Sequence, residues 1–127
     1  MILEYFKQLK ETIYLFDHII VDCSTEEKTY SDEKGFISGE IVFADNSQLD
    51  FAEVKEMGQK SKIKYRYHYM NHSKTLIFRY DNAKHYPNLS TFPHHKHTPS
   101  GVIESEAIDI ENVLKEIEAI VVKNNES

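Results

Sequence analysis

The apolar residues at the start of the chain repeat at the spacing of an α-helix. Ile2, Phe6, Leu9, Ile13 and Phe16 are separated by four, three, four and three positions, which brings them onto one helix face. Two lysines and two glutamates lie between them and supply a solvated opposite face. The pattern predicts an amphipathic helix over the first sixteen residues that packs against a core.

The same spacing returns near the end of the chain. Asp109 precedes this second stripe as a candidate N-cap, and Glu111 falls in the first turn, where a negative charge interacts favourably with the helix dipole. The sequence therefore predicts a C-terminal helix. Its apolar face consists of Ile110, Val113, Leu114, Ile117, Ile120 and Val121.

Between the two helices the apolar residues favour strands, with a period of two over much of the region. The predicted strands cover residues 18–23, 35–43, 48–53, 62–70 and 74–81. Residues 45–47 (Asp-Asn-Ser) supply turn chemistry between the second and third of these strands. The polar segment 26–34 is predicted to be a loop or an irregular hairpin arm, and the segment 53–60 is predicted to be a connector, with a turn of helix as an alternative.

Residues 82–101 contain all three prolines and no clear period, so they are predicted to form one irregular loop. A loop of about 20 residues is unusual in a compact domain unless it has a function. Residues 1–127 are thus predicted to form a single α+β domain. Its sheet is an antiparallel meander of about five strands, with the N-terminal and C-terminal helices packed on one face.

The strands 62–70 and 74–81 separate aromatic from basic residues. If the residue numbers of facing positions add up to an odd number, Tyr67 lies near Phe78 and Tyr65 near Tyr80. The basic positions of both strands then share the other face. The opposite parity would place tyrosines beside Arg79 and mix the two faces, so the pattern favours the odd sum.

Arg66, His68 and Arg79 gather on the basic face in this register. Neighbouring guanidinium groups repel each other unless an anion lies between them, and their forked geometry matches phosphate. The functional interpretation is therefore a phosphate-contacting surface. The alternative is an ordinary solvated face, which antiparallel sheets commonly have.

The charge of the chain is unevenly distributed. The net charge is −6, but residues 61–100 contain seven lysines and arginines against a single aspartate, together with six of the seven histidines. The remainder is therefore strongly acidic. No apolar stretch is long enough to span a membrane, no signal peptide is expected, and the single cysteine, Cys23, fits a reducing cytoplasm.

Four histidines lie within thirteen residues, at His85, His94, His95 and His97. Neutral imidazoles bind metals, although this spacing matches none of the common zinc patterns. A histidine pair also acts as general base and general acid, and a third alternative is a solvated, partly cationic loop. If the loop returns over the basic face, it brings residues 94–97 close to the arginines.

The run Phe78-Arg79-Tyr80-Asp81-Asn82-Ala83, followed by His85, Pro87 and Thr91-Phe92-Pro93-His94-His95-Lys96-His97, resembles the signature of the TumE family. Members of this family are classed as the toxin half of bacterial and archaeal toxin–antitoxin pairs. The resemblance implies a partner, namely a small antitoxin that usually carries a DNA-binding helix-turn-helix.

Three functional hypotheses follow. The leading one is the toxin of a type II toxin–antitoxin pair that acts on RNA, either by binding it or as a ribonuclease that needs no metal. Its predicted catalytic residues are Arg79, His94, His95 and His97, and its predicted nucleic-acid-binding residues are Lys64, Arg66, His68 and Lys96. The second is a metal-binding protein or nuclease. Its divalent transition metal would be held by Asp81, His85, His94, His95 and His97.

The third hypothesis is a non-catalytic interaction module. The two predicted helices and residues 22–56 carry most of the acidic side chains. Such a surface would bind a basic partner, either the antitoxin or a second protomer in a homodimer.

Overall fold

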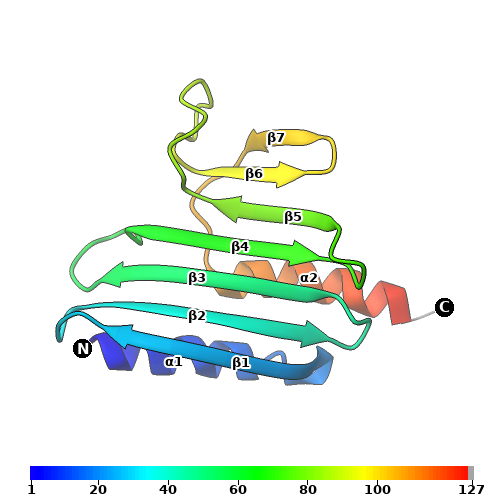
Figure 1. The fold of residues 1–127 in the computed structure, drawn as a ribbon, viewed down its shortest axis with the longest axis horizontal. Coiled ribbons are helices and arrows are strands. Elements are labelled where there is room, and N and C mark those ends of the chain that lie inside the picture. Colours follow the sequence, from blue (N-terminus) through cyan, green and yellow to red (C-terminus); the bar gives the residue numbers. More distant parts are fainter. Residues whose placement is uncertain (126–127) are drawn as a thin grey trace.

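The computed structural model describes residues 1–125, which fold into two long helices and one sheet (Figure 1). All neighbouring strands run antiparallel and follow the order β1 to β7, so the sheet is a meander. The elements are α1 (Ile2–Tyr14), a short 3₁₀ helix η1 (Asp17–Ile19), β1 (Ile20–Thr29), β2 (Lys34–Phe43), β3 (Gln48–Glu56), β4 (Lys64–Met70), β5 (Leu76–Asp81), β6 (His95–Thr98), β7 (Gly101–Glu104) and α2 (Ile110–Asn125).

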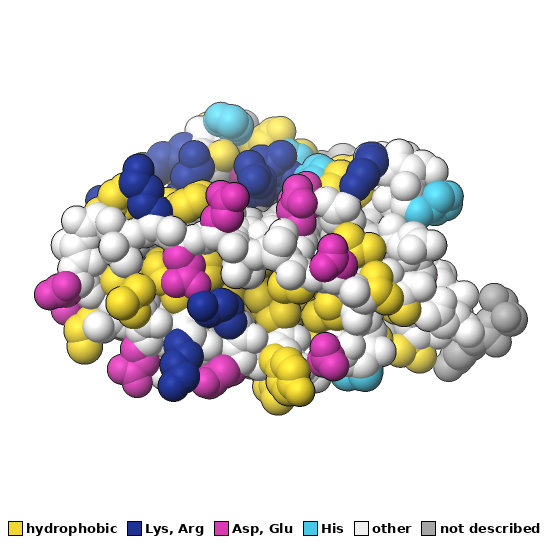
Figure 2. Space-filling model, turned by 60° about the horizontal axis from the view of Figure 1, so that its bottom comes forward, with side chains coloured by type: hydrophobic (Ala, Val, Ile, Leu, Met, Phe, Trp, Pro, Cys, Tyr) yellow, Lys and Arg dark blue, Asp and Glu magenta, His cyan; other side chains and the backbone are white. Residues whose placement is uncertain are grey.

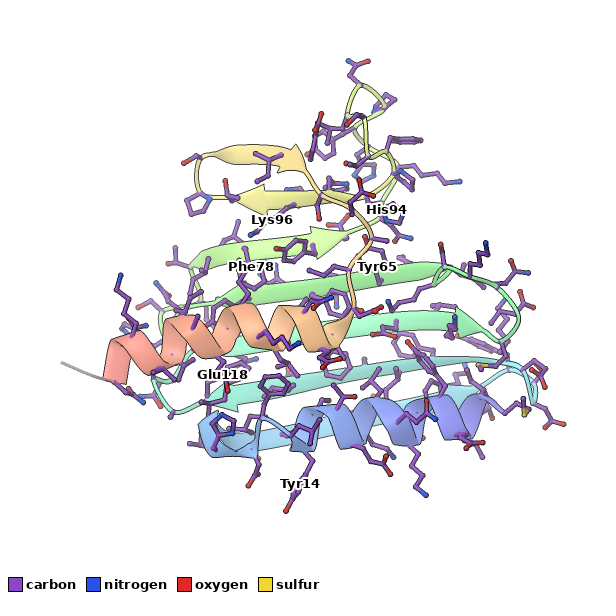
Figure 3. The ribbon with its side chains drawn as sticks, turned by 180° about the vertical axis from the view of Figure 1, so that it is seen from behind. Tyr14, Tyr65, Phe78, His94, Lys96 and Glu118 are labelled. Carbon is purple, nitrogen blue, oxygen red and sulfur yellow. The ribbon has the colours of Figure 1, made fainter. Side chains whose placement is uncertain are left out.

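Both helices lie on the same face of the sheet, which confirms the predicted layering (Figure 3). The apolar stripe of α1 is buried, as are five of the six predicted apolar positions of α2. The sixth, Ile120, is half-buried against the same core. The backbone carbonyl of Asp109 accepts a hydrogen bond from the amide of Val113, as expected of an N-cap residue. Neither helix has the length and apolar character needed to cross a membrane.

The predicted parity between β4 and β5 is confirmed, but the predicted partners are displaced by two residues. Tyr67 faces Tyr80, and Tyr69 faces Phe78, instead of the predicted pairs. The ladder also shifts register at Met70, next to a turn in which Lys74 has a positive φ of 65°. Because the side-chain period is two, a displacement by two keeps every aromatic residue on the core face.

Strands extend into three segments predicted to be loops or connectors. β1 continues to Thr29, so residues 26–29 form the arm of a hairpin with β2, which was one of the two predicted alternatives, and β3 continues to Glu56. β1 is an edge strand with mostly exposed side chains on both faces, so its sequence lacks an apolar alternation. The predicted loop 82–101 also contains β6 and the start of β7. The sheet among residues 1–125 thus has seven strands, compared with about five predicted.

A buried carboxylate lies in the core between the sheet and the helices. Glu53 is 1% exposed, and its two oxygens accept hydrogen bonds from the hydroxyls of Tyr5 and Tyr67. Burial, followed by the charge of Glu53, raises the pKa of Tyr67 well above its ordinary value. This polar cluster fixes α1 against β3 and β4. The face of the sheet opposite the helices, called the open face below, carries no helix within residues 1–125.

Candidate functional site

The open face of β4, β5 and β6 carries two cross-strand rows of polar side chains. In the first row, Asp81 of β5 faces Arg66 of β4 on one side and His95 of β6 on the other. In the second row, Arg79 faces His68 and His97 in the same way. Alternation along each strand places both rows on the face opposite the tyrosines. The register therefore brings residues from three strands together.

Asp81 is the centre of this arrangement. Its side chain is buried, and Arg79 donates a hydrogen bond from Nε to Oδ2 at 2.9 Å. The amide of Ala83 donates to Oδ1, also at 2.9 Å. Oδ1 lies 2.9 Å from Nε2 of His95, and Oδ2 lies 3.4 Å from Nε2 of His97. One carboxylate thus contacts both imidazoles and a guanidinium.

The two imidazoles also contact each other. Nε2 of His95 lies 3.1 Å from Nε2 of His97, and Nδ1 of His95 lies 2.9 Å from the carbonyl oxygen of Pro93. Tyr86 packs edge-on against both rings, with centroid distances of 4.9 Å to His95 and 5.8 Å to His97. His95 is 1% exposed, whereas the side chain of His97 is 27% exposed. The cluster is therefore buried on one side and open at His97.

Burial lowers the pKa of His97, the carboxylate of Asp81 acts to raise it, and the guanidinium of Arg79 acts to lower it further. The pKa of His68 is also lowered, chiefly by burial and by Arg79. In addition, Nδ1 of His68 is buried and lacks a hydrogen-bond partner among the described residues. His68 and His97 therefore both favour the neutral form.

A hollow of about 510 Å³ lies beside the cluster. Its walls include Lys64, Arg66, Arg79, Asp81 and His85. Arg66 also borders a second hollow of about 320 Å³ towards β1 and β2, where acidic side chains replace the basic ones. In Figure 2, lysine and arginine side chains gather along the upper part of the surface, with acidic side chains in front of them.

The structure brings together most, but not all, of the predicted site residues. His94 lies on the helix side, where its Nδ1 is 2.7 Å from the hydroxyl of Tyr65 and the two rings stack (Figure 3). Lys96 also points to that side, and its ammonium donates to Glu116 at 2.8 Å and lies over the ring of Tyr80. These two residues are separated by the sheet from the open-face rows.

The predicted metal-ligand set is likewise reduced. Asp81, His95 and His97 offer ligand atoms within 4.8 Å of one another, and His85 and His94 are not part of this group. Within residues 1–125 no other group of three potential ligands is found. The contribution of Tyr86 and of the Pro93 carbonyl was not predicted. The alternation His95-Lys96-His97 was the available signal, because it places two histidines on one face if the segment is a strand.

Comparison with known proteins adds one finding. The family model described as toxin TumE matches residues 8–124, which is nearly the whole chain and includes all seven strands of the described sheet, the second half of α1 and almost all of α2. The match therefore extends well beyond residues 62–97, which carry the motif. No similar curated protein and no similar solved structure was found.

Proposed function

Because this chain belongs to the TumE family of toxins, we propose that it is the toxin of a type II toxin–antitoxin pair and that it binds and cleaves RNA in the cytoplasm. The observation that supports this proposal most strongly is the hollow on the open face, lined by Lys64, Arg66 and Arg79 beside the Asp81 cluster. A cationic hollow next to a histidine–carboxylate group has the composition required for phosphodiester chemistry.

Arg66 and Arg79 are the proposed phosphate ligands. Arg79 uses Nε to hold Asp81, which leaves its two terminal amino groups for a bidentate contact with phosphate. Arg66 is exposed and borders both hollows, so it is positioned to hold a neighbouring phosphate of the same strand. Arginine suits both tasks because its charge persists at all physiological pH values.

Cleavage is assigned to the Asp81, His95 and His97 cluster. A simple acid–base pair from residues 94–97 requires two histidines that both reach the substrate. His94 lies on the helix side, and His95 is 1% exposed, so within residues 94–97 only His97 offers an imidazole to a phosphate on the open face. The proposed cleavage therefore uses Asp81, His95 and His97 together as one unit.

The proposed partner is a helix-turn-helix antitoxin, as the family assignment implies. The acidic surface outside residues 61–100 would bind a basic region of that partner. Co-expression with the product of the adjacent gene tests this part of the proposal. Recovery of the chain without that product would contradict it.

The function is tested with purified protein and a labelled single-stranded RNA. We expect the wild type to bind and cut the RNA, Arg66→Gln to bind it more weakly, and His97→Gln to bind it but cut it slowly. Lys7→Gln, which removes one charge from the exposed side of α1, is the matched control and should behave like the wild type. Equal cleavage by all variants, or cleavage by none, would refute the catalytic proposal.

A further inference from the structure

The protonation state of His95 is constrained by its surroundings. A backbone carbonyl only accepts hydrogen bonds, so the 2.9 Å contact with the carbonyl of Pro93 places the hydrogen of a neutral imidazole on Nδ1. Nε2 of His95 then carries a lone pair instead of a hydrogen. This lone pair faces Asp81 and His97, and His95 itself is only 1% exposed.

Three potential metal-ligand atoms converge next to this nitrogen, and with both imidazoles protonated on Nδ1 no hydrogen lies between them. Nε2 of His95 lies 2.9 Å from Oδ1 of Asp81 and 3.1 Å from Nε2 of His97. Oδ2 of Asp81 lies 3.4 Å from the same nitrogen of His97. Lone pairs held at such distances repel each other unless a cation is placed among them.

The separations match those of ligands that share a metal ion. Two ligand atoms about 2.05 Å from zinc lie about 2.9 Å apart at a right angle and about 3.3 Å apart at the tetrahedral angle. We propose that Asp81, His95 and His97 bind a divalent transition-metal ion, with zinc as the reference, through one carboxylate and two imidazole nitrogens. This donor set is one that such ions use in hydrolytic enzymes.

The surroundings of the three residues resemble the support that metal ligands usually have. The Nδ1–H group of His95 donates a hydrogen bond to the backbone carbonyl of Pro93. Asp81 accepts hydrogen bonds from Arg79 and from the amide of Ala83. Tyr86 covers both imidazoles, while His97 remains partly exposed. With three protein ligands and an open side, the ion would retain a position for water, as catalytic zinc sites do.

The use of this ion in cleavage rests on the proposed function, whereas its binding does not. A bound water that loses its proton to the solvent becomes a hydroxide, and its oxygen attacks the phosphorus of a phosphodiester held by the arginines. The P–O bond to the leaving ribose oxygen breaks, and that oxygen takes up a proton from solvent. No oxidant or further reactant is required.

The test is a metal titration of the full chain, purified without a histidine tag and treated with a chelator. We expect one Zn²⁺ per chain by calorimetry, and a visible absorption band when Co²⁺ is used as the probe. His97→Gln should weaken Zn²⁺ binding at least about 100-fold, because even the outer partners of ligands contribute about 10–100-fold. His72→Gln, an exposed histidine in the turn after β4, is the matched control and should bind like the wild type.

Asp81→Asn provides a second test, and circular dichroism shows whether this buried variant folds. His97 is partly exposed, so its variant remains informative if Asp81→Asn does not fold. Substoichiometric binding by the wild type, or equal Zn²⁺ affinity in His97→Gln, would overturn the metal site and leave His95 paired through a proton. RNA binding by the chelated protein is measured separately. Its absence alongside stoichiometric Zn²⁺ binding would refute the proposed function and leave the metal site standing.

Discussion

Substitution of Arg66 by glutamine should weaken RNA binding through the loss of one phosphate contact. Arg66 is exposed on the open face of β4 and borders both hollows. Arg66 lies at the boundary between the basic hollow and the acidic one, so it is the last cation that a bound RNA strand would contact before it reaches the acidic side chains. Glutamine keeps much of the length and the hydrogen-bonding capacity of the side chain but removes its charge.

The magnitude follows from the number of cations that line the basic hollow, namely Lys64, Arg66 and Arg79. Each phosphate neutralised on a single strand contributes about 0.7 to the slope of log affinity against log salt concentration. Three contacts give a slope of about −2.1, so affinity falls about 18-fold between about 50 mM and about 200 mM salt. With two contacts the slope is about −1.4, and the same change of salt costs about 7-fold.

Fluorescence anisotropy with a labelled single-stranded RNA over this range of salt measures both slopes. Lys7→Gln on α1 changes the net charge by the same amount and should leave the slope at the wild-type value. An unchanged slope in Arg66→Gln would refute the placement of RNA on the open face. An equal reduction in both variants would show that only net charge matters.

Three further predictions concern the two faces of the sheet. Lys96→Met should leave RNA affinity unchanged in the same assay, because the ammonium of Lys96 is bound to Glu116 on the helix side; a loss comparable with that of Arg66→Gln would contradict the assignment. Tyr67→Phe should lower the free energy of unfolding in urea by about 1.5–3 kcal/mol, since its hydroxyl donates to a buried carboxylate. Tyr69→Phe should cost only about 0.5–1.5 kcal/mol, because its partner is a neutral serine, and the reverse order would be inconsistent with this account. Burial raises the pKa of Tyr69 to about 12. Because this pKa lies above the ordinary value of about 10, the free energy of unfolding falls as the pH rises above about 10. The urea midpoint should therefore be lower at about pH 11 than at about pH 9. The difference should be smaller in Tyr69→Phe, which lacks the hydroxyl.

The elements that the sequence predicts correctly are those with one buried face. Both helices, β2 to β5 and the parity of β4 against β5 follow from apolar periodicity, because burial selects apolar residues at every second position or at every third and fourth position. The exact register does not follow from periodicity. A displacement by two preserves every face, and it depends here on the turn at Lys74 and the shift at Met70.

The site is predicted less completely than the fold. The clustering of arginines and histidines in the sequence corresponds to a cluster in space, because Arg66, Arg79, His95 and His97 all lie on the open face. The strand β6 is built from polar residues and has no apolar period, so its sequence does not identify it as a strand, and the alternation His95-Lys96-His97 separates its faces only once it is known to be one. For that reason the predicted set included His94, which the structure places on the helix side.

The positive segment 61–100 is consequently not a uniform basic surface. Lys62 and Lys96 face the helices, where Asp109 and Glu116 neutralise them, so these charges contribute little to attraction of a distant anion. The open face of β1 to β3 carries Glu26, Glu40 and Asp50 beside the basic hollow. These carboxylates repel a phosphate backbone, and Arg66 marks the border. On the proposed function, RNA on this face would therefore be restricted to β4, β5 and β6. Their width of about 10 Å at the usual strand spacing favours a single strand aligned with the Asp81 cluster.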